Sequence, residues 1–416
     1  MINKLFILIS VFFWTTFSFG QMDEEVLLIA RNTGKKVVAT GDTIRTMGFA
    51  LSLMENPPVP GPTLEFVEGD SIEIDLWNVS QGAPHTIHLH GLDVNQQNDG
   101  VPHLSFDVGH MDHGFYKFKA PQAGTYLYHC HVVSTIHVQA GMYGLIIVHP
   151  ADESQTTWTG GYEYDVSMSL MMSEIDTVWH NDTIIKHEYD STLAVHKVEL
   201  PYYDPQFYLV NGYSDEQIPE EGMALNTAVD AVNYIRLINI GYKGNRVVFP
   251  PSFEAKIIDS DGRPLPAVET SDTVFIYPGE RYGVIGVMPE EGVDFISVDY
   301  FDLNTGVFEN TQEVPIYTEG FVQLPNQKRS NYDLTVQPNP FDQTIFMELS
   351  AAKGGKLQVS ILNLNGEVID VIDERIISNE SIHHLTYSNA TLSSGTYLVQ
   401  VKVDGEIVLT QKIVKN

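Results

Sequence analysis

Ten of the fifteen histidines of this chain lie in one window, residues 85–149. In the first cluster, HTIHLHG, His88 and His90 stand two residues apart, so their side chains leave a β-strand on the same side. His85 stands at an odd spacing from both and faces the other side. Imidazoles are the commonest metal ligands in proteins, and their concentration here predicts metal chemistry.

The second cluster, YHCHVVSTIHVQAGMYG, places a thiol between two imidazoles. Cys130 is flanked by His129 and His131, so on a strand the two rings share one side and the sulfur takes the opposite one. His137 and Met142 follow, five residues apart. A single strand histidine is usually structural, and a buried cysteine is usually a small hydrophobic residue. The joint spacing of these side chains is what favours ligands.

Two strands carrying these residues side by side would form two different sites. One side gathers two imidazoles, a thiolate and a thioether: His85, Cys130, His137 and Met142. This donor set is that of a type 1, or blue, copper site. The opposite side gathers four imidazoles: His88, His90, His129 and His131. We expect a second copper site there, which binds oxygen or another small oxidant and receives electrons through Cys130 and its neighbours.

Strands must position these residues, and the strand signal is strong. Short runs rich in Val, Ile, Tyr and Phe continue from residue 25 to the C-terminus, broken by Gly, Pro and Asn; SIEIDLWNV (71–79) and GTYLVQVKV (395–403) are examples. They alternate in polarity or are β-branched over four to eight residues, and no long stretch has a helical period. The sequence therefore predicts an all-β protein built of sandwich or barrel domains.

The length of 416 residues suffices for three domains of roughly 100 to 150 residues. We expect a copper-binding domain over 22–152, a second domain of similar texture over 160–322, a polar linker over 323–333 and a compact last domain over 334–416. Residues 1–20 are predicted to be a cleaved export signal, because the apolar run of about ten residues after Lys4 is too short to span a membrane.

Composition excludes several classes of function. The chain has 23 basic and 54 acidic residues, a formal net charge of −31, so its surface repels phosphate groups and nucleic acid is a poor partner. Its single cysteine excludes a disulfide within the chain. A lone thiol in an exported protein tends to be oxidised, and ligation of copper would keep Cys130 occupied.

At these residues the chain resembles the multicopper oxidases, a family of laccase-like cupredoxin proteins. PGPTLEFVEGDSIEIDLWN (60–78) is similar to the opening of the family's first domain, and HTIHLHG and HCH…H…GM are similar to the copper motifs of its terminal domain. The resemblance implies two cupredoxin domains of Greek-key topology. It also implies type 1 ligands at His85, Cys130, His137 and Met142, and half of a trinuclear oxygen-reducing cluster at His88, His90, His129 and His131. Asp99 in NDGVP matches an acidic residue that assists proton delivery.

Two features depart from the family pattern. Five residues separate His131 from His137, where the family usually has three, although copper nitrite reductases also have a long loop here. A trinuclear cluster needs eight histidines, and residues 160–322, which resemble the family's middle domain, contain no His-x-His pair. A homotrimer that shares sites between neighbouring copies, or a simpler type 2 copper, would each account for this.

Residues 334–416 resemble the C-terminal sorting domain of proteins exported by type IX secretion in Bacteroidetes-type bacteria. The motif PNP (338–340), the hairpin signal Asn365-Gly366 and the strand run SGTYLVQVKV occur in the order typical of that domain. A carbohydrate-binding or adhesive sandwich is the alternative. The resemblance implies passage through the periplasm, export by the type IX machinery, and release or attachment at the cell surface.

The sequence thus predicts a secreted or cell-surface oxidoreductase. It would take electrons from a small-molecule or metal-ion donor at the type 1 site and pass them to oxygen at the four-imidazole site. Two alternatives stay open. One is an enzyme with chemistry like that of copper nitrite reductase, and the other is a blue-copper electron carrier or copper-binding protein that catalyses nothing.

Overall fold

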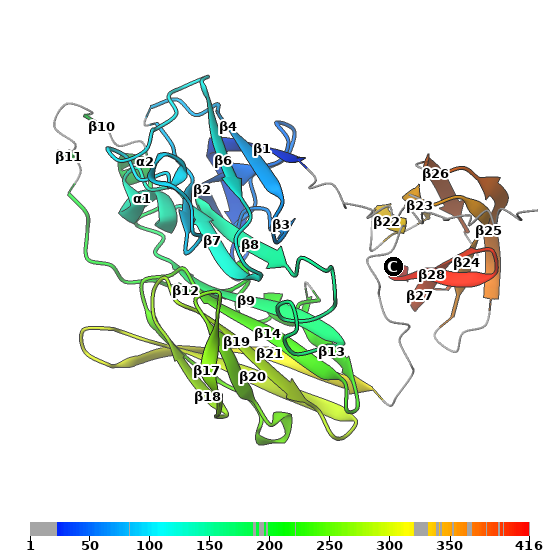
Figure 1. Cartoon of the computed structure of the whole chain (residues 1–416). Coiled ribbons are helices and arrows are strands. Elements are labelled where there is room, and N and C mark those ends of the chain that lie inside the picture. Colours follow the sequence, from blue (N-terminus) through cyan, green and yellow to red (C-terminus); the bar gives the residue numbers. More distant parts are fainter. Residues whose placement is uncertain are drawn as a thin grey trace, which may run out of the picture. The chain divides into compact units, whose positions relative to one another are not determined.

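The computed structural model describes residues 23–319 and 332–415, apart from residues 83, 186–188, 191–194, 197–198, 221, 338–340, 342, 352, 364–367, 380, 390–391 and 394. The predicted export signal, most of the linker, the PNP motif and the Asn365-Gly366 turn lie outside these residues. Within them the chain is almost entirely strand, which confirms the all-β prediction (Figure 1). The chain divides into two compact units, Met1–Val322 and Gln323–Asn416.

The first sandwich of the larger unit carries both histidine clusters. One sheet has the order β2-β1-β4-β6 and consists of β1 (Asp23–Val37), β2 (Thr43–Ala50), β4 (Ser71–Asn78) and β6 (His113–Lys119). The other has the order β3-β8-β7-β5 and consists of β3 (Leu64–Val67), β5 (His88–His90), β7 (Gly124–His129) and β8 (Tyr143–His149). In β4 every second residue is buried, including Ile72, Ile74 and Leu76, so one face of the sheet packs into the core between the sheets.

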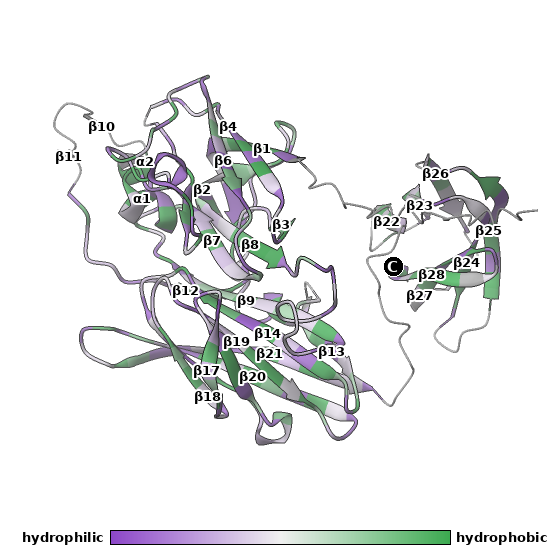
Figure 2. Cartoon of the chain, in the orientation of Figure 1, coloured by the Kyte–Doolittle hydropathy of each residue, from purple (hydrophilic) through white to green (hydrophobic). Residues whose placement is uncertain are grey.

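The second sandwich follows with a six-stranded and a five-stranded sheet. The order β12-β9-β14-β19-β16-β17 comprises β9 (Val166–Ile175), β12 (Phe207–Val210), β14 (Val232–Asn239), β16 (Lys256–Ser260), β17 (Arg263–Thr270) and β19 (Arg281–Val287). The order β13-β21-β20-β15-β18 comprises β13 (Leu225–Ala228), β15 (Gly244–Val248), β18 (Thr273–Ile276), β20 (Gly292–Phe301) and β21 (Phe308–Glu319). Figure 2 shows hydrophobic and hydrophilic residues mixed along these strands, as expected when each sheet has an inner and an outer face.

Both sandwiches have the same strand pairing. The parallel pairs β1–β4 and β3–β8 of the first sandwich correspond to β9–β14 and β13–β21 of the second. By this correspondence β15 and β20 take the places of β5 and β7, and the facing residues Gly244 and Phe301 take the places of His88 and His129. The second sandwich therefore presents no imidazole at these strand ends.

A buried lysine lies at this position of the second sandwich instead. Lys243 directly precedes β15 and is 3% exposed. Its Nζ lies 3.1 Å from a carboxylate oxygen of Asp302, which follows β20, and 2.7 Å from one of Glu309 in β21. One ammonium group thus joins the ends of three strands.

The helices are short and lie between the strands. They are α1 (Ser134–Gln139), α2 (Asp182–Ile185), α3 (Gln217–Glu220) and the 3₁₀ turns Gln96–Asn98 and Pro251–Phe253; β10 (Tyr189–Asp190) pairs with β11 (Val195–His196) in a separate ribbon. No helix in the described part of the chain has the length and apolar character needed to cross a membrane.

The last unit is a small sandwich of its own. Its sheets are β22-β23-β26 and β25-β24-β27-β28, built from β22 (Tyr332–Gln337), β23 (Thr344–Ala351), β24 (Gly355–Leu362), β25 (Val368–Ile377), β26 (Ser381–Ser388), β27 (Gly395–Val403) and β28 (Glu406–Lys415). The strands that flank the predicted Asn365-Gly366 turn, β24 and β25, pair antiparallel as a hairpin requires. Leu349, Val359 and Val399 are fully buried between the sheets.

Candidate metal centre

The end of β7 separates the histidines into two groups. Strand β5 pairs antiparallel with β7 so that His88 faces His129, and His85 forms an isolated bridge with Val108 just before β5. Because neighbouring strand residues point to opposite sides, Cys130 projects away from His129. The structure gathers His85, Cys130 and His137 in one group and His88, His90 and His129 in another; within each, the ligand atoms lie within 4.8 Å of one another.

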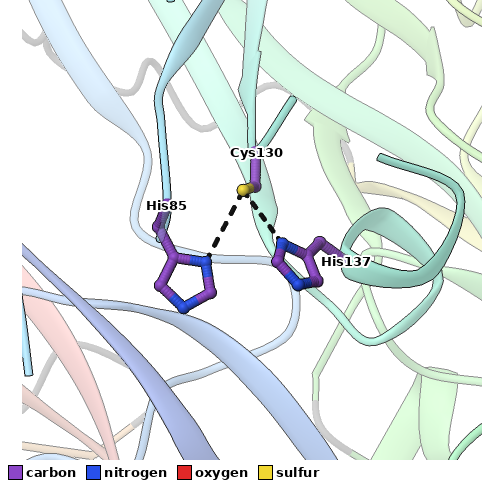
Figure 3. A group of neighbouring side chains, drawn as sticks. All are labelled: His85, Cys130 and His137. Atoms are coloured by element: carbon purple, nitrogen blue, oxygen red, sulfur yellow. Dashed lines mark hydrogen bonds between the residues drawn. The ribbon is translucent and has the colours of Figure 1, made fainter. Parts of the chain in front are cut away.

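The first group is fully enclosed and converges on the thiol. Cys130 Sγ lies 3.6 Å from His85 Nδ1 and 3.1 Å from His137 Nδ1. Figure 3 shows the same nitrogen of each ring directed at the sulfur. All three side chains are at most 1% exposed, so this group does not meet solvent. Two Nδ1 atoms and one sulfur directed at a common point can hold one metal ion.

The loop from Cys130 to Met142 closes this site. Cys130 N–H donates to Met142 O at 3.0 Å, and Met142 N–H donates to His137 O at 2.9 Å. The longer spacing between His131 and His137 is taken up by helix α1, on which His137 lies. Met142 is buried in the same core cluster as Cys130. Val133, which precedes α1, has φ +51°, a left-handed conformation that is unusual for a β-branched residue.

The chemistry of this donor set fits copper. Burial raises the pKa of the Cys130 thiol to about 12. A thiolate at this place therefore requires a neighbouring cation, which a bound metal ion supplies. Two imidazoles and a thiolate, with a buried methionine close by, are the donors of a blue-copper site.

The second group lies nearer to solvent. The His88 ring is 5.1 Å from the His129 ring, 5.3 Å from the His131 ring and 5.5 Å from the His90 ring, centre to centre. His131 thus joins the ring cluster, while the close set of ligand atoms consists of the other three. His88, His90 and His131 are partly exposed and His129 is buried, so small molecules can approach this group.

Hydrogen bonds orient these rings. His88 Nδ1–H donates to the Asp99 carbonyl at 2.7 Å, and His129 Nδ1–H donates to the Cys130 carbonyl at 3.2 Å. Carbonyl partners keep the proton on Nδ1, so both rings present Nε2 as the atom that can bind a metal ion. His90 Nδ1 lies 3.4 Å from His129 Nε2, a pair that one metal ion can bridge. The Asp99 carboxylate is 3.6 Å from His88 Nδ1 and partly exposed.

Three rings of this group, those of His90, His129 and His131, are held neutral. Burial, followed by the charge of Arg281, lowers the pKa of His90 to about 4, and burial lowers the pKa of His129 to about 3. Burial also lowers the pKa of His131. Neutral imidazoles keep their lone pairs at neutral pH, which is the state that a metal ion binds.

A buried polar network ties α1 to the second sandwich. Glu174 of β9 accepts hydrogen bonds from Tyr242 N–H at 2.8 Å and from the Tyr203 hydroxyl at 3.2 Å. Gln139 of α1 donates to the Glu174 carbonyl and to Tyr203, at 3.0 Å each. The Tyr242 hydroxyl donates to the Thr135 carbonyl at 2.7 Å. Hydrogen bonds thus hold the helix that carries His137 near its start, at Thr135, and at its end, at Gln139.

The supporting residues were not predicted from the sequence. Thr86, whose hydroxyl accepts a hydrogen bond from His131 N–H at 3.0 Å, stood within the quoted HTIHLHG motif. Gln139, Glu174 and Arg281 are far apart in sequence and show no spacing pattern.

Several other histidines have local partners. His110 Nδ1 donates to Ser80 O at 2.7 Å, His113 Nδ1 lies 2.8 Å from Asp75, and His180 Nδ1 donates to Arg45 O at 2.6 Å. Among the described residues these three join neither metal group. His187 lies outside the described residues.

Two family models match the chain. The multicopper oxidase model matches residues 41–153, and the model of the secretion system C-terminal sorting domain matches residues 335–416. The first match spans most of the first sandwich, and the second covers nearly the whole last unit.

Relatives and solved structures agree with these matches. Copper resistance protein A of Escherichia coli is 36% identical over 29% of this chain and 18% of its own length. The copper-containing nitrite reductase of Alcaligenes xylosoxydans xylosoxydans is 29% identical over 40% of this chain and 51% of its own. The chain therefore spans about half or less of these curated relatives.

The solved blue copper oxidase of Nitrosomonas europaea superimposes with a TM-score of 0.56 at 27% identity, over 71% of this chain and 86% of that one. This agreement supports the two cupredoxin-like sandwiches. The chain thus carries a stretch that matches the multicopper oxidases at residues 41–153 and a secretion system C-terminal sorting domain at residues 335–416.

Proposed function

We propose that this protein is an exported copper-dependent oxidoreductase with two copper centres. The observation that carries the proposal is the pair of donor groups on opposite sides of the β7 end. His85, Cys130, His137 and Met142 would hold a type 1 copper, and His88, His90, His129 and His131 would hold the second copper centre. Cys130 is covalently joined to His129 and His131, so the shortest path between the groups runs through the backbone of three residues.

Copper bound in these groups supplies one-electron oxidation and reduction. The protein's contribution differs between the groups. The first excludes solvent, so an electron donor, a small molecule or a metal ion, delivers electrons without touching the copper. The second is partly exposed and admits oxygen, the proposed acceptor. The Asp99 carboxylate, partly exposed beside His88, is placed to pass protons between solvent and this group.

The number of copper ions in the second group is set by the available imidazoles. The second sandwich presents Lys243, Gly244 and Phe301 at the strand ends that match the histidine-bearing ones. A complete trinuclear cluster would therefore need ligands from another copy of the chain, as in a homotrimer. A monomer by light scattering that keeps full oxidase activity would contradict the shared cluster and favour a simpler type 2 copper.

Nitrite reduction is the second candidate. The match to a copper-containing nitrite reductase and the long spacing between His131 and His137 favour it. A blue-copper electron carrier is the third, because an intact first group suffices for that role. Oxygen consumption with a phenolic or cuprous donor distinguishes an oxidase from a carrier, and anaerobic nitrite turnover distinguishes the two enzymes.

Export is the proposed route of delivery. The sorting-domain match at residues 335–416 implies a secreted or cell-surface protein. We propose that residues 1–20 direct the chain into the periplasm and that the type IX secretion machinery recognises the last unit. Deletion of residues 334–416 should leave the protein in the periplasm. Appearance of the truncated protein in the medium would contradict this route.

The first measurement is the copper-to-chain ratio, with visible and electron spin resonance spectra. A ratio of two or more with both a type 1 and a type 2 signal supports a catalytic centre, and a ratio near one with a type 1 signal alone supports the carrier. Cys130→Ser should abolish the blue colour, whereas His88→Ala should keep the colour and remove turnover. A blue Cys130→Ser protein would show that the type 1 assignment is wrong.

A further inference from the structure

A segment of the second sandwich packs directly on the four-imidazole group. Gly91, which follows His90, has φ +86°, and a Cβ atom there would lie 2.1 Å from Arg281 Nη2. Gly279 has φ +88°, and a Cβ atom there would lie 3.1 Å from His90 Cε1 and 3.4 Å from its Nε2. Gly91 thus allows Arg281 to pack on the turn after His90, and Gly279 allows its own backbone to approach the His90 ring.

Arg281 is held in this position by one ion pair and two hydrogen bonds. Its Nη1 lies 2.9 Å from an Asp261 carboxylate oxygen and donates to the Gly279 carbonyl at 2.7 Å. Its Nε donates to the carbonyl of Thr125 in β7 at 3.4 Å. The side chain is 3% exposed, so the guanidinium cannot swing into solvent without disrupting the interface between the sandwiches.

One donor of this buried guanidinium is not used. Nη2 is inaccessible to solvent and has no hydrogen-bond partner among the described residues. Buried charged donors are normally satisfied, and an unsatisfied one costs free energy unless a ligand engages it. The carboxylate that pairs with this guanidinium, Asp261, is about half exposed and forms its ion pair with Nη1, not with Nη2. Positive charge and a free donor therefore remain beside His90.

We propose that Arg281 makes the second metal centre selective for small inorganic anions. An anion bound to a metal ion held by His88, His90 and His129 would accept a hydrogen bond from Nη2 and lie beside the guanidinium charge. The inference rests on the proposed function, because it requires a metal ion in this group. It gives the second sandwich, which presents no ligand histidine at its matching strand ends, a direct part in the centre.

Azide is the probe for this site, titrated into the copper-loaded full-length protein and followed by its charge-transfer absorption and by spin resonance of the type 2 signal. Arg281→Gln should weaken azide binding about tenfold, which corresponds to about 1.4 kcal/mol. Arg281→Lys, which keeps the charge, should retain most of the affinity. Asp261→Asn, which removes the countercharge, should tighten azide binding. Arg246→Gln is the matched control, because Arg246 pairs with Asp299 within the second sandwich.

The outcomes separate this inference from the proposed function. If the wild-type protein holds a second copper and Arg281→Gln binds azide as wild type does, Arg281 has no such role and the oxidoreductase proposal stands. If Arg281→Gln does not fold, unchanged azide affinity in Asp261→Asn overturns the inference. If the wild-type protein holds only a type 1 copper, both proposals are wrong.

Discussion

Glu174 should make the stability of the larger unit fall as the pH rises. This carboxyl lies inside the network beneath α1 and is 2% exposed. Burial raises its pKa from the ordinary value of 4.5 to about 7, although hydrogen bonds from Tyr242, Lys243 and Tyr203 partly offset this. Between these two values the folded protein binds more protons at this group than the unfolded chain does. The free energy of unfolding therefore decreases with increasing pH in this window.

The size of the effect follows from the shift. Each pKa unit corresponds to about 1.4 kcal/mol, so the full shift is worth about 3 kcal/mol, of which about 2 to 3 kcal/mol is lost between pH 5 and pH 8. Glu174→Gln removes the titrating group while keeping a side-chain carbonyl as acceptor. We expect the decrease in unfolding free energy between pH 5 and pH 8 to be smaller in this variant by that amount.

Tryptophan fluorescence can isolate the unit concerned. The four tryptophans are Trp14, Trp77, Trp158 and Trp179, so all precede the last unit. Urea unfolding followed by their fluorescence at pH 5, 6, 7 and 8 reports the larger unit. Glu291→Gln, at an exposed position of the same unit, is the control and should keep the wild-type dependence. Equal pH dependence in Glu174→Gln and the wild-type protein would show that the buried carboxyl does not titrate in this window.

Three further predictions concern the metal groups and their supports. Gly100→Ala should lower the free energy of unfolding by more than about 2 kcal/mol and should lower the copper-to-chain ratio, because Gly100 has φ +75° and a Cβ atom there would lie 1.9 Å from Ile87 O. Urea unfolding and metal analysis test these two effects. Tyr242→Phe should lower the free energy of unfolding by about 1 kcal/mol, because it removes the hydrogen bond to Thr135. An unchanged urea midpoint would refute this prediction. Chelation of copper should lower the unfolding temperature of the larger unit and leave that of the last unit unchanged, which calorimetry can test.

The sequence predicted the sides on which the histidines lie, because side-chain direction in a strand has a period of two. Odd and even positions in a strand point to opposite sides. This rule separates His85 from His88 and His90, and Cys130 from His129 and His131, in agreement with the two groups in the structure. The same periodicity, with the turn residues between strands, predicted the all-β fold.

The helix α1 and its supports could not be predicted in this way. Six residues are too few to show a helical period, and α1 is held by Tyr242 and Gln139 through contacts that depend on tertiary structure. Arg281 reaches His90 across about 190 positions of sequence, as the numbering shows. Its role depends on how two sandwiches pack, which no local pattern records.

The ion-paired Lys243 has a consequence for how the chain matures. The first sandwich presents imidazoles at its strand ends, whereas the second carries a cation there as part of its own covalent structure. A lysine cannot be chelated or exchanged, and its charge does not change when electrons arrive. The charge that joins the strand ends of the second sandwich is thus present as soon as the chain is made, and it does not depend on a supply of metal.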